Sequence, residues 1–221
     1  MKAYNINDIT DSIEFFKTLD TNLLANMLSH SGVHSFYKGQ ILFFEQDDID
    51  KVYYLIEGSI KFYKVDRFDN EVFLYKLYGP KLIFDLSKFG NTPIIRCFAN
   101  AEFDEDSTIL AIENSWFEEN YLKDKKLMHN IMKESFSMIA GLQCIINRDI
   151  VFDGTAKVAH FLANDLQTYN KLKKHEIAYM LHIQPETLSR IVKKLVRNEI
   201  ISTDKNSVII EHIDRLKEIY E

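Results

Sequence analysis

Between Val33 and Ile112 the apolar residues occur in short runs that are rich in β-branched and aromatic side chains. The runs read QILFFEQ, KVYYLIE, SIKFYKV and EVFLYKLY. They are separated by the turn signals Gln46-Asp47-Asp48, Glu57-Gly58 and Phe68-Asp69-Asn70, and Lys38-Gly39 and Gly79-Pro80 flank them. Short strands repeated at roughly 8–12-residue spacing are typical of antiparallel sandwiches and barrels. The pattern therefore predicts an α+β fold that contains a small antiparallel β jelly roll (a double-stranded β-helix).

On both sides of this region the spacing of apolar residues becomes helical. Phe15, Leu19 and Leu23 follow one another at steps of four, which places them on one face of a helix. Neither Gly nor Pro interrupts residues 115–140, which predicts a long helix. Asp153-Gly154-Thr155 then ends this pattern and can begin a new helix. These breaks predict three parts: a jelly-roll unit with N-terminal helices at residues 1–120, a dimerisation helix at residues 121–152, and a C-terminal unit at residues 153–221.

The long helix carries a heptad-like line of side chains. Its members, at steps of four, three, four and three, are Ile131, Ser135, Met138, Leu142 and Ile145. Such a line is typical of a seam that pairs two subunits. Over two or three heptads, a helix that packs only on its own domain gives the same pattern, so this alternative stays open. We predict a homodimer with these five residues in the interface.

Residues 185–198 form a strongly amphipathic helix. The apolar side chains of Leu188, Ile191, Val192 and Leu195 fall on one face. The opposite face carries Glu186, Ser189, Arg190, Lys193 and Arg197. Pro185 suits the first turn, where its missing N–H costs no hydrogen bond.

The sequence around this helix predicts a winged helix-turn-helix. Upstream, KKHEIAYMLHI predicts a shorter helix, in which the small Ala178 lets the second helix approach closely. Downstream, IISTDKNSVII predicts a strand, a turn and a strand, which is the wing. In this motif the second helix enters the major groove of DNA. The residues assigned to base edges are Glu186, Ser189 and Arg190, and those assigned to phosphates are Thr187, Lys193, Lys194, Arg197 and Lys174.

Charge supports a local interaction with DNA. The chain has 27 Lys and Arg against 33 Asp and Glu, a formal net charge of −6, so general attraction to polyanions is not expected. Basic residues nevertheless predominate between Lys171 and Lys205. The alternative is an interaction module that docks an acidic protein through the same basic helix without binding DNA. Such a docking helix would require neither a wing nor the Glu186, Ser189 and Arg190 face.

Composition narrows the remaining classes. The N-terminus shows no signal peptide, and no run of about 18 apolar residues predicts a membrane span. Cys97 and Cys144 are the two cysteines, too few for a four-cysteine metal site, and we expect a reduced cytoplasmic protein. No His lies between Tyr37 and Ser115, which argues against a metal-dependent jelly-roll enzyme. We predict no enzymatic activity.

The chain resembles the CRP/FNR family of bacterial transcription regulators along nearly its whole length. In the C-terminal part the resemblance depends on EIAYMLHIQPETLSRIVKKLVRNEII. In the N-terminal part it depends on Phe36-x-x-Gly39-x-x-Leu42-Phe43, on Val52-Tyr53-x-Leu55-x-x-Gly58-x-x-Lys61, and on Gly79-Pro80. The resemblance implies a homodimer that binds an inverted repeat of TTGA-type half-sites, and contact with RNA polymerase if it activates. One departure is His182, where such turns often carry Gly, so His182 must adopt an unusual backbone angle.

The resemblance also suggests which effectors to consider. Cys97-Phe98 stands where the cyclic-AMP binders carry an Arg-Ser pair, and residues 1–96 hold no Cys for an iron–sulfur cluster, so neither cofactor is expected. The open alternatives are haem, a small apolar effector, redox sensing by Cys97 or Cys144, or no effector. The candidate haem ligands are His30, His34 and His129. The candidate effector pocket comprises Phe84, Cys97, Phe98, Met128 and Met132.

Overall fold

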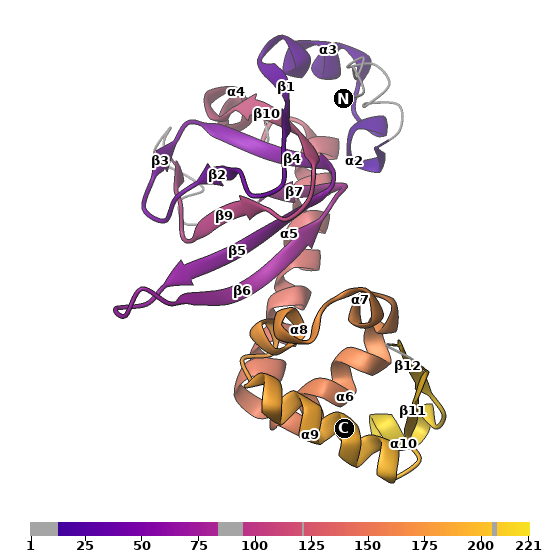
Figure 1. Cartoon of the computed structure of the whole chain (residues 1–221). Helices are drawn as coiled ribbons and strands as arrows, with labels where there is room; N and C mark the ends of the chain where they lie inside the picture. The colour runs from indigo at the N-terminus through magenta and orange to yellow at the C-terminus, as the bar shows by residue number, and fades with distance from the viewer. Residues whose placement is uncertain (1–12, 84–94, 121, 205–206) are drawn as a thin grey trace. The chain divides into compact units, whose positions relative to one another are not determined.

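The computed structural model describes residues 13–83, 95–120, 122–204 and 207–221 of the chain (Figure 1). Contacts between Cα atoms divide the chain into two compact units, Met1–Ile139 and Ala140–Glu221. Each unit has a buried apolar core of its own. Among the described residues, no helix is both long enough and apolar enough to cross a membrane.

Two four-stranded antiparallel sheets form most of the first unit, as the ribbon in Figure 1 shows. One sheet has the strand order β1-β10-β4-β7 and the other has the order β2-β9-β5-β6, while β3 pairs with β8. The strands are β1 (Ser31–Phe36), β2 (Ile41–Phe43), β3 (Asp48–Ile49), β4 (Lys51–Glu57), β5 (Ser59–Val65), β6 (Glu71–Tyr78), β7 (Lys81–Ile83), β8 (Ile95–Arg96), β9 (Asn100–Phe103) and β10 (Ser107–Glu113). The predicted antiparallel jelly roll is confirmed.

Among the described residues of the first unit, four helices accompany these sheets. They are α2 (Glu14–Lys17), α3 (Thr21–Ser29), α4 (Asn114–Asn120) and the first part of α5 (Lys125–Ile146). Their apolar side chains form one cluster with the outer side of the β1-β10-β4-β7 sheet, to which Phe16, Trp116 and Ile131 contribute.

Strands β4 and β10 are buried on both sides. Leu55 and Ile109 belong to the cluster that both sheets share, whereas Tyr54 and Leu110 belong to the cluster of the helices. Successive side chains of a strand point to opposite faces, so a strand covered on both faces needs apolar residues at consecutive positions. This explains why KVYYLIE and STILAIE are nearly continuous apolar runs.

The second unit combines helices with a two-stranded wing. Its elements after α5 are a π-helical turn η2 (Asn147–Val151), α6 (Gly154–Asn164), α7 (Leu166–Lys171), α8 (Lys174–Met180), α9 (Pro185–Arg197), β11 (Ile201–Asp204), β12 (Ser207–Ile210) and α10 (Ile213–Lys217). The carboxylate of Asp153 begins α6 by accepting hydrogen bonds from the N–H groups of Thr155 and Ala156, both at 2.8 Å. The core includes Val158, Leu162, Ile177 and Val208. A long helix followed by a helix-turn-helix unit is the order that the sequence predicts.

Gly58, in the turn from β4 to β5, meets both a conformational and a steric requirement. Its φ is +95°, in the left-handed region that Gly enters without cost. A Cβ added here would lie 2.6 Å from Ser107 Cβ and 2.8 Å from Ser107 Cα. Gly39 has a similar φ of +84°, yet nothing lies within 4 Å of its added Cβ.

We therefore expect Gly58→Ala to destabilise the first unit more than Gly39→Ala. Gly39→Ala should cost about 1–2 kcal/mol, which is the price of the left-handed conformation alone. Gly58→Ala adds a clash that should cost roughly a further 1–3 kcal/mol. Urea unfolding followed by the fluorescence of Trp116 measures both values. Equal losses in the two variants would contradict the steric argument.

Candidate nucleic-acid interface

Helix α9 buries one face and exposes the other. Gln184 precedes it with extended backbone, and Pro185 occupies the first turn. On the apolar face Leu188, Ile191 and Leu195 are buried in the core of the second unit. Only one rotation of the helix covers these three side chains, and this rotation fixes which residues face solvent.

The exposed face of α9 carries the residues that the sequence assigns to DNA. Glu186, Arg190, Lys193 and Arg197 are exposed and lie near the centre of this face, at steps of three or four residues. On one flank Thr187 is half-buried and Lys194 is exposed, and on the other flank Ser189 is half-buried. Lys174, at the start of α8, is also exposed. All eight predicted residues are therefore at the surface of the second unit.

Arg190 has a neighbour that limits its freedom. Its Nη2 donates a hydrogen bond to Thr187 Oγ1 at 3.2 Å. Thr187, Arg190 and Lys194 also line an open hollow of about 330 Å³ beside Asp153 and Thr155 at the start of α6. A guanidinium has five N–H donors, so the bond to Thr187 leaves donors for a base edge.

The turn between α8 and α9 adopts the strained backbone that the sequence predicts. Leu181 ends α8, and the next residue, His182, has a φ of +53°. The N–H of Ile183 then donates to the carbonyl of Ala178 at 3.0 Å, which closes the turn. Ala178 itself is 2% exposed, in agreement with its predicted role as the small residue between the two helices.

The wing follows α9 directly. Strands β11 and β12 pair antiparallel from Ile201 opposite Ile210 to Asp204 opposite Ser207. Asn170 of α7 fixes β12 through two hydrogen bonds with the backbone of Val208, at 2.8 and 2.9 Å. The tip of the wing, residues 205–206, lies outside the described residues.

Two family models match this chain. The model of the Crp-like helix-turn-helix domain covers residues 156–219, and that of the cyclic nucleotide-binding domain covers residues 33–124. Together they account for more than two thirds of the chain. Their order along the chain is the order predicted for the jelly roll and the DNA-binding part. The chain belongs to the CRP/FNR family. Its members are DNA-binding transcription regulators rather than enzymes, and they are typically dimeric.

Solved structures show the same fold. A CooA mutant from Carboxydothermus hydrogenoformans has a TM-score of 0.73 and 18% identity, over 100% of this chain and 98% of that one. The c-di-GMP-responsive regulator CLP from Xanthomonas campestris has a TM-score of 0.66 and 14% identity, over 86% and 99%. CprK complexed with OCPA has a TM-score of 0.67 and 19% identity, over 89% and 92%. No curated protein is significantly similar in sequence.

Helix α5 requires a correction to the predicted seam of this CRP/FNR protein. Ile131 is 8% exposed inside the core of its own unit, and Met138 packs against the same cluster, so the first half of the predicted line faces the jelly roll. The exposed apolar side chains of this half are one position further along. They are Met132, Phe136 and Ile139, which are 47%, 62% and 45% exposed. In the second unit Leu142 is 37% exposed and Ile145 is half-buried.

The predicted effector pocket is not gathered in one place among the described residues. Cys97 is buried in the core between the sheets, whereas Phe98 is 55% exposed with Lys64 Nζ 4.2 Å from its ring centroid. Met128 is half-buried and Met132 is exposed on α5. Phe84 lies outside the described residues. The positions of the described residues therefore give no support to the predicted effector pocket, which stays a prediction.

The three candidate haem ligands have different surroundings. His34 is exposed on β1. His129, on α5, lines a cavity of about 200 Å³ together with Tyr54, Asn130 and Glu134. This volume is below the roughly 300–1,000 Å³ of typical ligand pockets. Among the described residues, no group of three or more His, Cys, Asp or Glu side chains is arranged to hold a metal ion.

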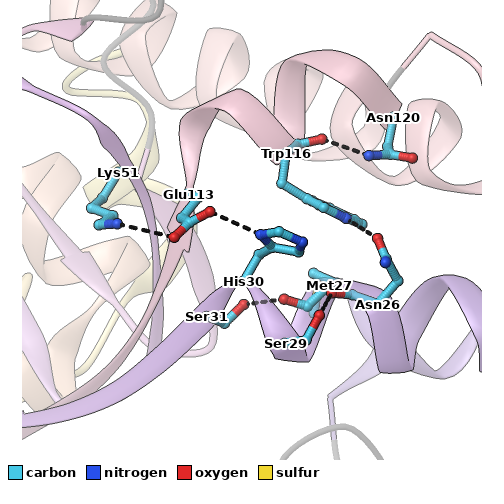
Figure 2. Close-up of polar contacts among 9 residues, drawn as sticks. All are labelled: Asn26, Met27, Ser29, His30, Ser31, Lys51, Glu113, Trp116 and Asn120. Carbon is cyan, nitrogen blue, oxygen red and sulfur yellow. Dashed lines mark hydrogen bonds and ion pairs between the residues drawn. The ribbon is translucent and has the colours of Figure 1, made fainter.

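His30 is engaged by a carboxylate, as Figure 2 shows. His30 Nδ1 lies 2.8 Å from Glu113 Oε2, and Lys51 Nζ lies 3.8 Å from Glu113 Oε1. In the same cluster Trp116 Nε1 donates to Asn26 Oδ1. These contacts attach α3 to β10 and α4. The hydrogen bond from His30 lowers the pKa of Glu113 below its ordinary value of 4.5.

This cluster should respond to acid. A carboxyl group whose folded pKa is lowered stabilises the fold above its unfolded pKa and loses this contribution as pH falls through the folded pKa. We therefore expect the fluorescence of Trp116, the one tryptophan of the chain, to change as pH falls below about 4.5. Glu113→Gln should remove this transition, and Glu119→Gln, on the exposed side of α4, should keep it. The same titration in both variants would contradict the assignment to Glu113.

Proposed function

We propose that a homodimer of this protein recognises an inverted repeat of the form TTGA-N6-TCAA. The observation that carries the proposal is the exposed face of α9, where Glu186, Ser189 and Arg190 lie within the first two turns. Regulators that this chain resembles, and that carry the same Glu-x-x-Ser-Arg face, read half-sites of the TTGA type. The N-terminal part of a recognition helix is the part that reaches base edges.

Each base-reading side chain has a chemical role in this proposal. Arg190 donates two hydrogen bonds to O6 and N7 of the guanine, which is the commonest specific contact in the major groove. Glu186 accepts from the amino group of a cytosine or adenine, and Ser189 meets a thymine edge. The hydrogen bond from Arg190 to Thr187 orients the guanidinium before DNA arrives.

The phosphate contacts come from the flanks of the same surface. Lys193 and Arg197 continue the exposed line of α9 beyond Arg190, while Thr187 and Lys194 lie on its α6 side. Lys174 is placed at the start of α8, the helix that precedes the turn. Cations on phosphates supply affinity and fix the register without reading sequence.

Dimerisation should place two recognition helices about 34 Å apart, one turn of DNA. We assign the seam in the first unit to Met132, Phe136 and Ile139, because these large apolar side chains are exposed on one line of α5. The repeat spacing of a palindromic site follows from the two-fold symmetry. RNA polymerase is the expected further partner if the protein activates transcription.

An effector other than cyclic AMP fits the first unit best. Arg96, which directly precedes Cys97-Phe98 in the sequence, donates from Nε and Nη2 to the carboxylate of Asp48 at 3.0 and 3.3 Å. A guanidinium that already binds a carboxylate is a poor clamp for a phosphate. Two structural relatives are described with small molecules, CLP as c-di-GMP-responsive and CprK in complex with OCPA. Their examples support control of this protein by a small molecule.

The absorption spectrum of the purified protein separates haem from the other effectors. A Soret band that is lost in His129→Ala and kept in His34→Ala would support haem bound at α5. Protein that shows no Soret band after expression with added haem would exclude haem and leave a small apolar effector, redox sensing by Cys97 or Cys144, or no effector. His30 could offer only Nε2 to iron, because its Nδ1 already contacts Glu113, and an imidazole held by a carboxylate in this way can still bind a metal through its other nitrogen.

Arg190→Ala should weaken binding to a TTGA-N6-TCAA duplex by roughly 1–3 kcal/mol and relax the preference for its G·C pair. Binding titrations with the matched duplex and with one whose guanine is replaced measure both effects. Arg215→Ala, which removes the same charge from the exposed side of α10, should leave affinity unchanged. An Arg190 variant that keeps its base preference would contradict the placement of α9 in the groove.

Lys193→Ala provides the contrast for this experiment. It should weaken matched and unmatched duplexes alike and reduce the slope of log affinity against log salt by roughly 0.9, the contribution of one phosphate contact. A selective loss on the matched duplex would instead show that Lys193 reads bases.

Phe136→Glu should convert the dimer to a monomer, because it buries a charge in each half of the seam. Sedimentation at micromolar protein concentration measures the mass. Lys126→Glu, on another side of α5, is the control and should keep the dimer. If Phe136→Glu remains dimeric, the seam does not include this face of the helix.

A further inference from the structure

Besides the residues assigned to DNA, the second unit contains one carboxylate, that of Asp149, which is surrounded by basic side chains. Asp149 lies in the π-helical turn η2, directly after α5. Arg148 Nε and Nη2 donate to its two carboxylate oxygens at 2.7 and 2.8 Å. Lys157 Nζ of α6 lies 4.0 Å from Oδ1, and His182 Nδ1 lies 3.7 Å from the same atom. Three different elements thus converge on one side chain.

The two more distant basic residues, Lys157 and His182, both contact or form the turn between α8 and α9. Lys157 is 8% exposed, and its Nζ donates to the carbonyl of Leu181, at the end of α8, at 3.3 Å. His182 is the next residue and holds the turn at a φ of +53°. A non-Gly residue at positive φ needs surrounding contacts to keep it there. Asp149 supplies such a contact to His182 and neutralises the buried Lys157.

The charge state of Asp149 agrees with this arrangement. Burial alone would raise the pKa of Asp149, but the hydrogen bonds from Arg148 and the nearby ring of His182 outweigh burial and hold the pKa well below its ordinary value of 3.8. The carboxylate is therefore ionised at neutral pH, where it attracts the guanidinium of Arg148 and the ammonium of Lys157 and lies beside the ring of His182. Among the described residues, Asp149 is the one carboxylate within 4.0 Å of Lys157 Nζ.

We propose that Asp149 is a positioning residue for DNA recognition, which holds the α8–α9 turn at His182 and so sets the direction of the recognition helix α9. Asp149 itself does not contact DNA and acts through His182. Because η2 follows α5 without a break, the same contact ties the end of the long helix to the turn. A shift of η2 would then change the backbone of His182 and the presentation of Arg190.

A double-mutant cycle with glycine tests this role. Gly adopts positive φ without strain, so His182→Gly removes the need for a restraint on the turn. We expect Asp149→Asn to reduce affinity for the TTGA-N6-TCAA duplex about tenfold in the natural background, a change of 1.4 kcal/mol. In the His182→Gly background the same substitution should cost less than about threefold, since coupled residues give non-additive effects. Equal losses in both backgrounds would overturn the proposal.

A second measurement is independent of DNA, because the cycle depends on the proposed function. Hydrogen exchange at the amide of Ile183, which donates across the turn to Ala178, reports opening of the turn directly. Asp149→Asn should speed this exchange about tenfold, and His182→Gly should remove most of the increase. If the natural protein does not bind the duplex but shows this exchange pattern, the proposed function fails and the positioning role of Asp149 stands. Unchanged hydrogen exchange at the Ile183 amide in Asp149→Asn would contradict the positioning role.

Glu211→Gln is the matched control for general destabilisation. Glu211 accepts a hydrogen bond from Ser202 Oγ at 2.5 Å beside the wing, in the same unit but on other elements than η2, α6 and the α8–α9 turn. It should lower the melting temperature without changing exchange at Ile183. If Asp149→Asn does not fold, the cycle is repeated with Lys157→Met in every variant, which removes the buried charge that Asp149 also neutralises. Equal losses in the two His182 backgrounds there would also overturn the proposal.

Discussion

Burial of the apolar face of α9 determines what the DNA-binding unit presents to solvent. Leu188 and Leu195 are each 1% exposed and Ile191 is 8% exposed. Covering a side chain of this size contributes roughly 1.5–3 kcal/mol, whereas an exposed ion pair contributes about 1 kcal/mol or less. Packing therefore prevails over the mutual repulsion of Arg190, Lys193 and Arg197 and holds these cations on one outward line. The net charge of −6 for the whole chain does not affect this local arrangement.

The first unit follows a similar rule on a larger scale. Strands β4 and β10 are covered on one side by the second sheet and on the other by helices, and the start of α5 shares the core on the helix side through Ile131. A helix anchored in this way can respond to a change inside the roll. Among the described elements, α5 is the helix that contributes to both units, and η2 continues it to Asp149. The contact of Asp149 with His182 then gives the DNA-binding turn a physical link to that helix.

Local patterns were sufficient to predict α9, the wing and the tight turns. Pro185 indicates the start of a helix, the 3.6-residue period of apolar side chains indicates the helix itself, and Gly58 indicates a tight turn. Each of these signals lies within a few residues of sequence. Local patterns could not predict which side chains of α5 are exposed for the dimer seam, because the lines that begin at Ile131 and Met132 both have heptad spacing. Only the position of the roll decides that Ile131 is covered and Phe136 is not. The cluster at Asp149 was also missed, since Lys157 resembles a surface lysine and His182 is 33 positions from Asp149. The positive φ of His182, which the sequence did predict, was the signal that a restraint had to exist.

In the proposed dimer, two copies of α9 read DNA about one turn apart. Selection of bound duplexes from a random pool by the full-length protein tests it most directly, because the selection assumes no half-site. We expect an enriched motif with two-fold symmetry, TTGA-like half-sites and a spacing of six base pairs. An enriched motif without two-fold symmetry, or a pool that shows no enrichment, would contradict it.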